Sequence, residues 1–156
     1  MTSISIRPAV VEERSVLLDL QWRASLTHDA YRELLLQHPE AVDLPVPHIE
    51  DGNTLVAEVA GRIVGFAVNL RISESEMELD GLFVEPERNG EGIGRYLVQK
   101  AEQRARANGA SSLMVIASPE VLGFYRQCGF EVVKETPVRF GTAFMLRKII
   151  SDRQNV

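Results

Sequence analysis

The spacing of hydrophobic residues along the chain changes repeatedly between the two-residue period of strands and the longer period of helices. The clearest helical segment is Gly92–Asn108, in which Ile93, Leu97, Ala101 and Ala105 recur at every fourth position. The segment ends in an asparagine followed by a glycine, which is typical of a helix terminus. The pattern therefore predicts one long amphipathic helix in the second half of the chain.

The remaining segments predict an alternation of shorter strands and helices, with a hairpin turn at Gly61. Their order, β-α-α-β-β-β-α-β-α-β-β, is typical of an α/β protein with a mixed sheet and helices on its faces. The other predicted helices are Ala9–Thr27, Asp29–Gln37 and Pro119–Gln127. The predicted strands are Ser3–Arg7, Thr54–Ala60, Arg62–Leu70, Glu76–Val84, Ser112–Ala117, Phe130–Glu135 and Thr142–Lys148.

One connection, His38–His48, contains three prolines. Proline cannot donate a backbone hydrogen bond, so this composition predicts a loop. Long loops in compact domains are often functional, and we expect this one to border a substrate site.

Length and charge limit the classes of function. The chain has 156 residues, and we expect a single domain at residues 1–150 with a frayed tail at 151–156. Its net charge of −5 gives no general affinity for nucleic acid, because phosphate binding needs a basic surface. We find neither a signal-peptide pattern nor an apolar run that could span a bilayer, so a cytoplasmic location without membrane attachment is expected.

The cysteine and histidine content argues against a metal site. Cys128 is the only cysteine, which excludes an internal disulfide and a cysteine cluster and fits a reducing compartment. His28, His38 and His48 lack the spacing of a helical metal-binding pair. We therefore expect no metal cofactor.

The most informative segment joins the strand Glu76–Val84 to the long helix and has glycines at positions 90, 92 and 94. Glycines let the backbone approach a ligand closely, and the first amides of a helix attract anions such as a pyrophosphate. Arg95 can add a charged contact. The segment lacks the lysine of a P-loop and fails the Gly-x-Gly-x-x-Gly pattern in both registers. It fits either a pyrophosphate site or a glycine-rich turn without a ligand.

The order Leu82-Phe83-Val84-x-Pro86 followed by Asn89-x-x-Gly92-x-Gly94 resembles the signature of the GNAT family of N-acetyltransferases. Asn89 stands where the family usually has glutamine or arginine. The resemblance implies that acetyl-coenzyme A is bound, with its pantetheine arm along the strand and its pyrophosphate in the loop. The cofactor-binding residues implied are Leu82, Phe83, Val84, Asn89, Gly90, Glu91, Gly92, Ile93, Gly94, Arg95 and Ser118.

The segment from Ser118 to Phe130 resembles a second GNAT motif, Asn-x-x-Ala-x-x-Leu/Phe-Tyr-x-x-x-Gly-Phe. Ser118 and Val121 replace the usual asparagine and alanine, whereas Tyr125 matches. Attack of an amine on a thioester expels a thiolate, and a tyrosine near the sulfur can protonate it. Tyr125 is therefore the candidate general acid. A core aromatic residue beside Phe124 fits the same position.

Acetyl transfer also needs a base, because an ammonium group is not nucleophilic. The strand period places Glu76, Glu78 and Asp80 on one face. The resemblance implies that this strand carries the base or its water relay, with Glu78 as first candidate and Asp80 as second. A solvated acidic face, or a patch that attracts a cationic substrate, fits the same pattern.

Together these features predict an N-acetyltransferase that uses acetyl-coenzyme A and transfers the acetyl group directly to a primary amine in a ternary complex. A small-molecule amine or amino acid is preferred over a protein amine as acceptor, and a homodimer stays open. Two alternatives remain: a non-catalytic coenzyme A-binding module, which Asn89 and Ser118 would allow, and a phosphate-binding domain for another nucleotide. Release of free thiol would separate the first alternative from the enzyme.

Overall fold

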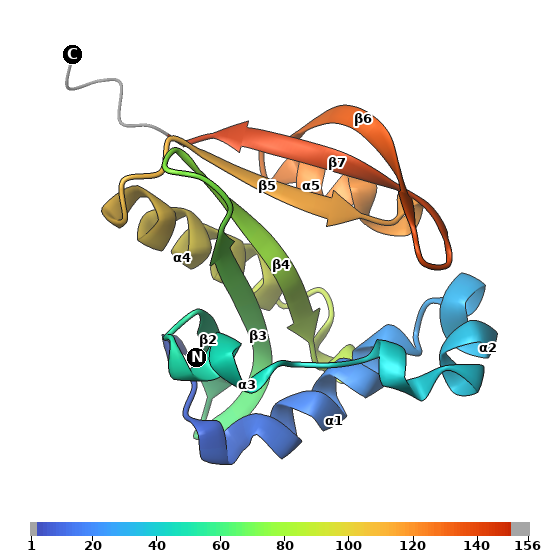
Figure 1. Cartoon of the computed structure of the whole chain (residues 1–156). Helices are drawn as coiled ribbons and strands as arrows, with labels where there is room; N and C mark the ends of the chain where they lie inside the picture. The colour runs from blue at the N-terminus through green and yellow to red at the C-terminus, as the bar shows by residue number, and fades with distance from the viewer. Residues whose placement is uncertain (1–2, 151–156) are drawn as a thin grey trace. The chain divides into compact units, whose positions relative to one another are not determined.

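The computed structural model describes residues 3–150, and the predicted tail at 151–156 lies outside them. Within the described part, seven strands form a mixed sheet with the hydrogen-bonded order β1-β2-β3-β4-β5-β7-β6 (Figure 1). This confirms the predicted α/β class with a mixed sheet. The strands are β1 (Ile4–Pro8), β2 (Thr54–Val59), β3 (Arg62–Arg71), β4 (Glu76–Val84), β5 (Ser112–Ala117), β6 (Glu131–Val138) and β7 (Gly141–Ile149). The helices are α1 (Arg14–Ser25), α2 (Asp29–Gln37), α3 (Val46–Glu50), α4 (Ile93–Ala107) and α5 (Leu122–Gln127).

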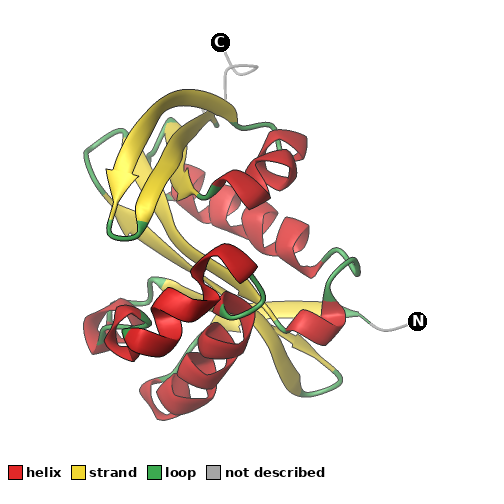
Figure 2. Cartoon of the chain, turned by 90° about the vertical axis from the view of Figure 1, so that its right-hand side faces the viewer, coloured by secondary structure: helices red, strands yellow, loops and turns green. Residues whose placement is uncertain are grey.

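The chain forms two compact units. Within the described residues 3–150, the first unit runs to Val68 and includes Gly81–Leu97, and the second comprises Asn69–Asp80 and the residues from Val98 onward. Strands β3 and β4 and helix α4 each run from one unit into the other. Figure 2 distinguishes the helices and strands that make up both units.

The first unit is built on antiparallel strands. β1 pairs with β2, and β2 pairs with β3. The turn between β2 and β3 contains Ala60 and Gly61, both with positive φ (52° and 79°), which is the geometry of a tight hairpin and confirms the predicted turn. Leu17 and Leu20 of α1 are fully buried in this unit, as are Val56 of β2 and other strand residues. The apolar face of α1 therefore supplies part of the core.

The second unit combines one parallel and two antiparallel strand pairs. β4 pairs in parallel with β5, and β7 lies antiparallel between β5 and β6. Helix α5 lies on one side of these strands (Figures 1 and 2). Lys148 of β7 joins the layers, because its Nζ donates to the Cys128 carbonyl at the end of α5 (2.8 Å) and pairs with Glu102 of α4 (2.9 Å). This charge-assisted contact fixes both helices to β7.

The prediction for the long helix is confirmed almost to the residue. Ile93, Leu97, Ala101 and Ala105 are all at most 1% exposed. Gly109 follows the helix with a φ of 86°, the left-handed conformation that glycine favours after a helix end. A hydrophobic residue on every turn is thus a reliable local signal here, because each one faces the core.

Two helical predictions need correction. The segment 38–48 is not all loop, since it contains a 3₁₀ turn at Pro39–Ala41 and the start of α3 at Val46. Both begin with proline in the first two positions, where the missing N–H would have no partner within the helix anyway. The helix predicted from Ala9 begins only at Arg14, after a 3₁₀ turn at Val11–Glu13.

Candidate functional site

The glycine-rich turn after β4 has a backbone that requires glycine at two positions. After a 3₁₀ turn at Pro86–Arg88, Gly90 and Gly92 have φ values of 87° and 85°. A Cβ built on either glycine would meet no protein atom within 4 Å. The two glycines are therefore needed for the backbone conformation, and the space beside them is open to a ligand.

The start of α4 supplies backbone amides next to these glycines. The Tyr96 N–H donates to the Gly92 carbonyl (3.0 Å), which is the first turn of the helix. The amides of Ile93, Gly94 and Arg95 thus precede the helix's own hydrogen-bond ladder, at the end of the helix dipole that attracts anions. Glu91 would oppose an anion, but it forms an ion pair with Arg88 (3.2 Å).

Strand β4 differs along its length in its pairing with β5. The parallel pairing covers Glu76 to Glu78 in the described residues, and Leu82, Phe83 and Val84 are not part of it. On the β3 side, the Phe83 carbonyl oxygen lies only 2.9 Å from where a Cβ of Gly65 would be. The three cofactor-strand residues are half-buried. Their arrangement fits the expectation that an extended ligand pairs with this part of β4.

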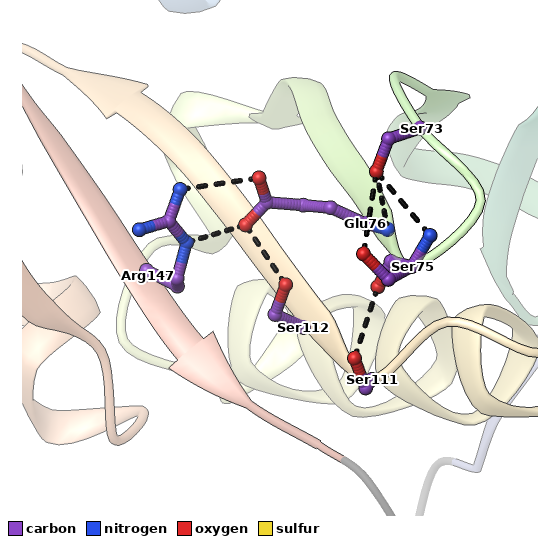
Figure 3. A network of polar contacts seen from close by, with 6 residues as sticks. All are labelled: Ser73, Ser75, Glu76, Ser111, Ser112 and Arg147. Atoms are coloured by element: carbon purple, nitrogen blue, oxygen red, sulfur yellow. Dashed lines mark hydrogen bonds and ion pairs between the residues drawn. The ribbon is translucent and has the colours of Figure 1, made fainter.

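The acidic residues of β4 lie as the strand period predicts. Met77 and Leu79 are buried at 5% and 1% exposure, whereas the carboxylate residues between and beside them are half-buried or exposed. Glu76 is fully engaged: Arg147 Nη2 donates to Oε1 (3.1 Å), Arg147 Nε donates to Oε2, and Ser112 Oγ donates to Oε2 (2.9 Å) (Figure 3). The Arg147 hydrogen bonds hold the pKa of Glu76 below its usual range.

Glu78 is in a different environment from Glu76. In the described part of the chain, its carboxylate has no hydrogen-bond or ion-pair partner. Partial burial raises the pKa of Glu78, and the charge of Asp80 adds to the rise. A carboxylate with a raised pKa is a better proton acceptor than an ordinary surface glutamate. Asp80 itself is exposed.

Tyr125 of α5 is a buried tyrosine between two other aromatic rings. It is 7% exposed, and its ring makes edge-on contacts with Phe124 (5.0 Å between centroids) and Phe130 (5.7 Å). Burial raises the pKa of Tyr125 well above its usual range, with a further rise from Cys128, so the phenol stays protonated at neutral pH. Ser118 lies just after β5 and before the 3₁₀ turn Pro119–Val121.

The predicted site residues fall into the two units. The first unit holds the cofactor strand and the whole loop with Asn89, and the second unit holds Glu78, Asp80, Ser118 and Tyr125. Sequence reasoning missed two residues that bear on these groups: Arg147, which pairs with Glu76, and Glu85, which pairs with Arg23. In both cases the partner is more than sixty positions away, and no local pattern marks it.

Two features of the described residues concern other classes of site. No helix between residues 3 and 150 is long and apolar enough to span a bilayer. The same part of the chain contains no group of three or more His, Cys, Asp or Glu side chains placed to hold a metal ion.

Comparison with known proteins gives consistent matches. The glucosamine 6-phosphate N-acetyltransferase 1 of Oryza sativa subsp. japonica is 27% identical over 67% of this chain and 64% of its own length. The chloroplastic serotonin N-acetyltransferase 2 of the same plant is 34% identical over 61% of this chain and 44% of its own length. The match thus spans less than two thirds of either relative.

A solved structure shares the fold. The crystal structure of PaiA N-acetyltransferase from Thermoplasma acidophilum in complex with coenzyme A has a TM-score of 0.75, with 19% identity over 94% of this chain and 99% of that one. A family model described as an acetyltransferase (GNAT) domain matches residues 37–147, which include β4, the glycine loop and Tyr125. On this match, which covers more than half of its length, the chain belongs to the GNAT acetyltransferase family.

Proposed function

We propose that this chain transfers an acetyl group from acetyl-coenzyme A to the primary amine of a small molecule. The observation that supports the proposal most strongly is the loop at residues 89–95, with two left-handed glycines leading into the first amides of α4. The two plant relatives are named for small amines, glucosamine 6-phosphate and serotonin, and the similar PaiA structure contains coenzyme A. These names favour a small amine over a protein amine.

The loop and strand have the donor groups that coenzyme A needs. A diphosphate accepts hydrogen bonds from the amides of residues 92–95, and the Arg95 side chain lies at the same end of α4. The backbone groups of Leu82, Phe83 and Val84 lie outside the β4–β5 pairing and can take the pantetheine amides as added strand partners. Asn89 and Ser118 replace side chains that the family motifs usually carry, so backbone amides bear more of the binding.

Bound acetyl-coenzyme A supplies the activated thioester, and the chain's own residues move the protons. Glu78 accepts a proton from the acceptor ammonium, directly or through water, which leaves a nucleophilic amine. The C–N bond forms and the C–S bond breaks, the sulfur leaves as a thiolate, and the nitrogen loses its second proton to solvent as it becomes the amide. Tyr125 donates its phenolic proton to that thiolate and regains a proton from solvent. Asp80 is the second candidate for the base.

The proposal is tested by following free thiol release from acetyl-coenzyme A in the presence of a panel of small amines, amino acids and a lysine peptide. The expected result is thiol release that depends on a small amine. If coenzyme A binds but no amine on the panel supports turnover, the result favours the alternative of a non-catalytic coenzyme A-binding module. A thermal-shift titration tests the remaining alternative, a phosphate-binding domain for another nucleotide, because only a ligand that binds the native state raises the melting temperature. A shift with ATP and none with coenzyme A would contradict the proposal.

A further inference from the structure

We propose that Glu85, held by Arg23 of α1, is a positioning residue for the coenzyme A loop. This inference rests on the proposed function, because it assigns a role to residues around the same loop. Glu85 is the residue between the end of β4 and the 3₁₀ turn Pro86–Arg88 that opens the loop. It does not touch the ligand in this proposal, and it acts through the backbone that follows it.

The side-chain contact between Arg23 and Glu85 is bidentate. Arg23 Nε donates to Oε1 (2.8 Å) and Nη2 donates to Oε2 (2.7 Å). Glu85 is only 9% exposed, although a carboxylate at a strand end would ordinarily point into water. Burial of a carboxylate is unfavourable without a partner, so the fold depends on Arg23 at this point. Consistent with this, the Arg23 hydrogen bonds lower the pKa of Glu85 despite its burial.

The backbone of Glu85 is held as firmly as its side chain. Its N–H donates to the Val64 carbonyl of β3 (2.8 Å), and its own carbonyl accepts from the Arg88 N–H (2.8 Å). Glu85 is thus fixed to β3, to α1 and to the turn that follows. A shift of this residue would move Arg88 and the loop behind it.

The packing beside Glu85 leaves little room for a compensating movement. A Cβ on Gly65 of β3 would lie 2.9 Å from the Phe83 carbonyl and 3.2 Å from side-chain atoms of Ile93 and Leu97. Strand β3 therefore contacts both sides of the loop: the cofactor strand before it and the first turns of α4 after it. Glu85 lies between these two contacts, at the point where the loop leaves β4.

A second ion pair of the same unit provides a matched control. Arg7 donates to both carboxylate oxygens of Glu13 (3.0 and 2.6 Å), a bidentate geometry like that of Arg23 and Glu85. It joins β1 to the 3₁₀ turn Val11–Glu13, and Arg7 also donates to Glu58 of β2 (2.7 Å), so these partners lie outside the loop. Glu13→Gln and Arg23→Met therefore both weaken a bidentate pair in the first unit, and only the second change acts on the loop.

The experiment measures coenzyme A affinity by calorimetry and backbone amide exchange by mass spectrometry for the wild type, Arg23→Met, Arg23→Lys, Glu85→Gln and Glu13→Gln. We expect Arg23→Met to raise the dissociation constant about fivefold or more, the size of a typical coupling between sites. Arg23→Lys should fall between Arg23→Met and the wild type, because it keeps the charge but loses the bidentate geometry. Amides of residues 87–95 should exchange faster in Arg23→Met and not in Glu13→Gln.

Each result has a separate meaning. If Arg23→Met and Glu85→Gln bind coenzyme A as tightly as Glu13→Gln does, the positioning role is wrong. Equal amide exchange in the loop of Arg23→Met and the wild type would also overturn it, and that readout needs no ligand. If the wild type itself ignores coenzyme A, the proposed function fails, while the exchange data still decide whether Arg23 and Glu85 hold the loop.

Discussion

Arg147 on β7 donates two hydrogen bonds to the Glu76 carboxylate on β4, and this pair distinguishes Glu76 from Glu78 two residues further along the strand. Both carboxylates lie on the same face. Glu76 is neutralised by Arg147 and accepts a hydrogen bond from Ser112, whereas no partner in residues 3–150 neutralises Glu78. Of the three acidic residues on this face, Glu76 is therefore a structural carboxylate and Glu78 is the candidate base. The charge of the nearby Asp80 raises the pKa of Glu78.

Glu78→Gln should abolish most of the acetyl transfer without loss of stability. A carboxyl group whose pKa is higher in the folded state than in the unfolded state opposes folding once it ionises, so stability falls as pH rises between the two values. Removing the charge at pH 7 should leave the melting temperature equal or higher. Thiol-release rates and a thermal melt check this together. A variant that keeps full activity would remove Glu78 from its role.

Asp80→Asn separates the two base candidates. The charge of Asp80 raises the pKa of Glu78, so its removal should lower that pKa. If Glu78 is the base, the acidic limb of the pH–rate profile shifts to lower pH and the plateau rate persists. If the plateau rate collapses instead, Asp80 is the base. The measurement is the rate at saturating substrate from about pH 4, near the ordinary pKa of a glutamate carboxyl group, to about pH 9.

Tyr125→Phe should lower the turnover rate by about a hundredfold, the usual scale of general acid catalysis. The hydroxyl has no hydrogen-bond partner among the described residues, and the ring contacts with Phe124 and Phe130 remain. Coenzyme A affinity and the melting temperature should therefore change little. The control is an acetyl donor with a more acidic thiol. Its thiolate needs less help from a proton donor, so Tyr125→Phe should lower the turnover rate less with this donor than with acetyl-coenzyme A.

Gly92→Ala should weaken coenzyme A binding about tenfold, which corresponds to about 1.4 kcal/mol. Its φ of 85° is unfavourable for alanine by about 1–2 kcal/mol, so the loop must adjust or carry strain. Gly109→Ala is the matched control, since Gly109 has a φ of 86° and equally open space at the far end of α4. Both variants should lose similar stability in denaturant titrations. Equal coenzyme A affinity in the two would argue against the loop as the binding site.

Glu76→Gln should destabilise the protein by about 1 kcal/mol at neutral pH, as expected for a charge-assisted pair that is partly exposed. The folded-state pKa of Glu76 lies below the reference value of 4.5, so its contribution is present above pH 4.5 and is lost as pH falls through the folded-state value. The difference in unfolding free energy between variant and wild type should therefore shrink in acid. Urea titrations at pH 7 and pH 3, about the range where carboxylates protonate, give the comparison.

The local elements of this fold follow from the sequence because each depends on near neighbours. The four-residue repeat of Ile93, Leu97, Ala101 and Ala105 predicts α4, since a helix brings these positions to one buried face. The alternation around Met77 and Leu79 predicts β4 with its true bounds. The hairpin at Gly61 was likewise predicted from neighbouring residues, namely two strand-like segments joined at a glycine. The loop predicted for the proline-containing segment 38–48 was wrong in part, because the sequence does not distinguish a proline at the start of a helix from a proline in a loop.

The sequence by itself therefore determined the order of the strands and of every helix except α3, together with the family signature and the glycine turn. Each of these features depends on residues that are close together in the sequence. Only the tertiary structure decided which carboxylates are neutralised. Arg147 lies 71 positions from Glu76, and Arg23 lies 62 positions from Glu85. The pKa of a carboxylate depends on burial and on charges within a few ångströms, and distances of that kind exist only after the strands and helices have packed.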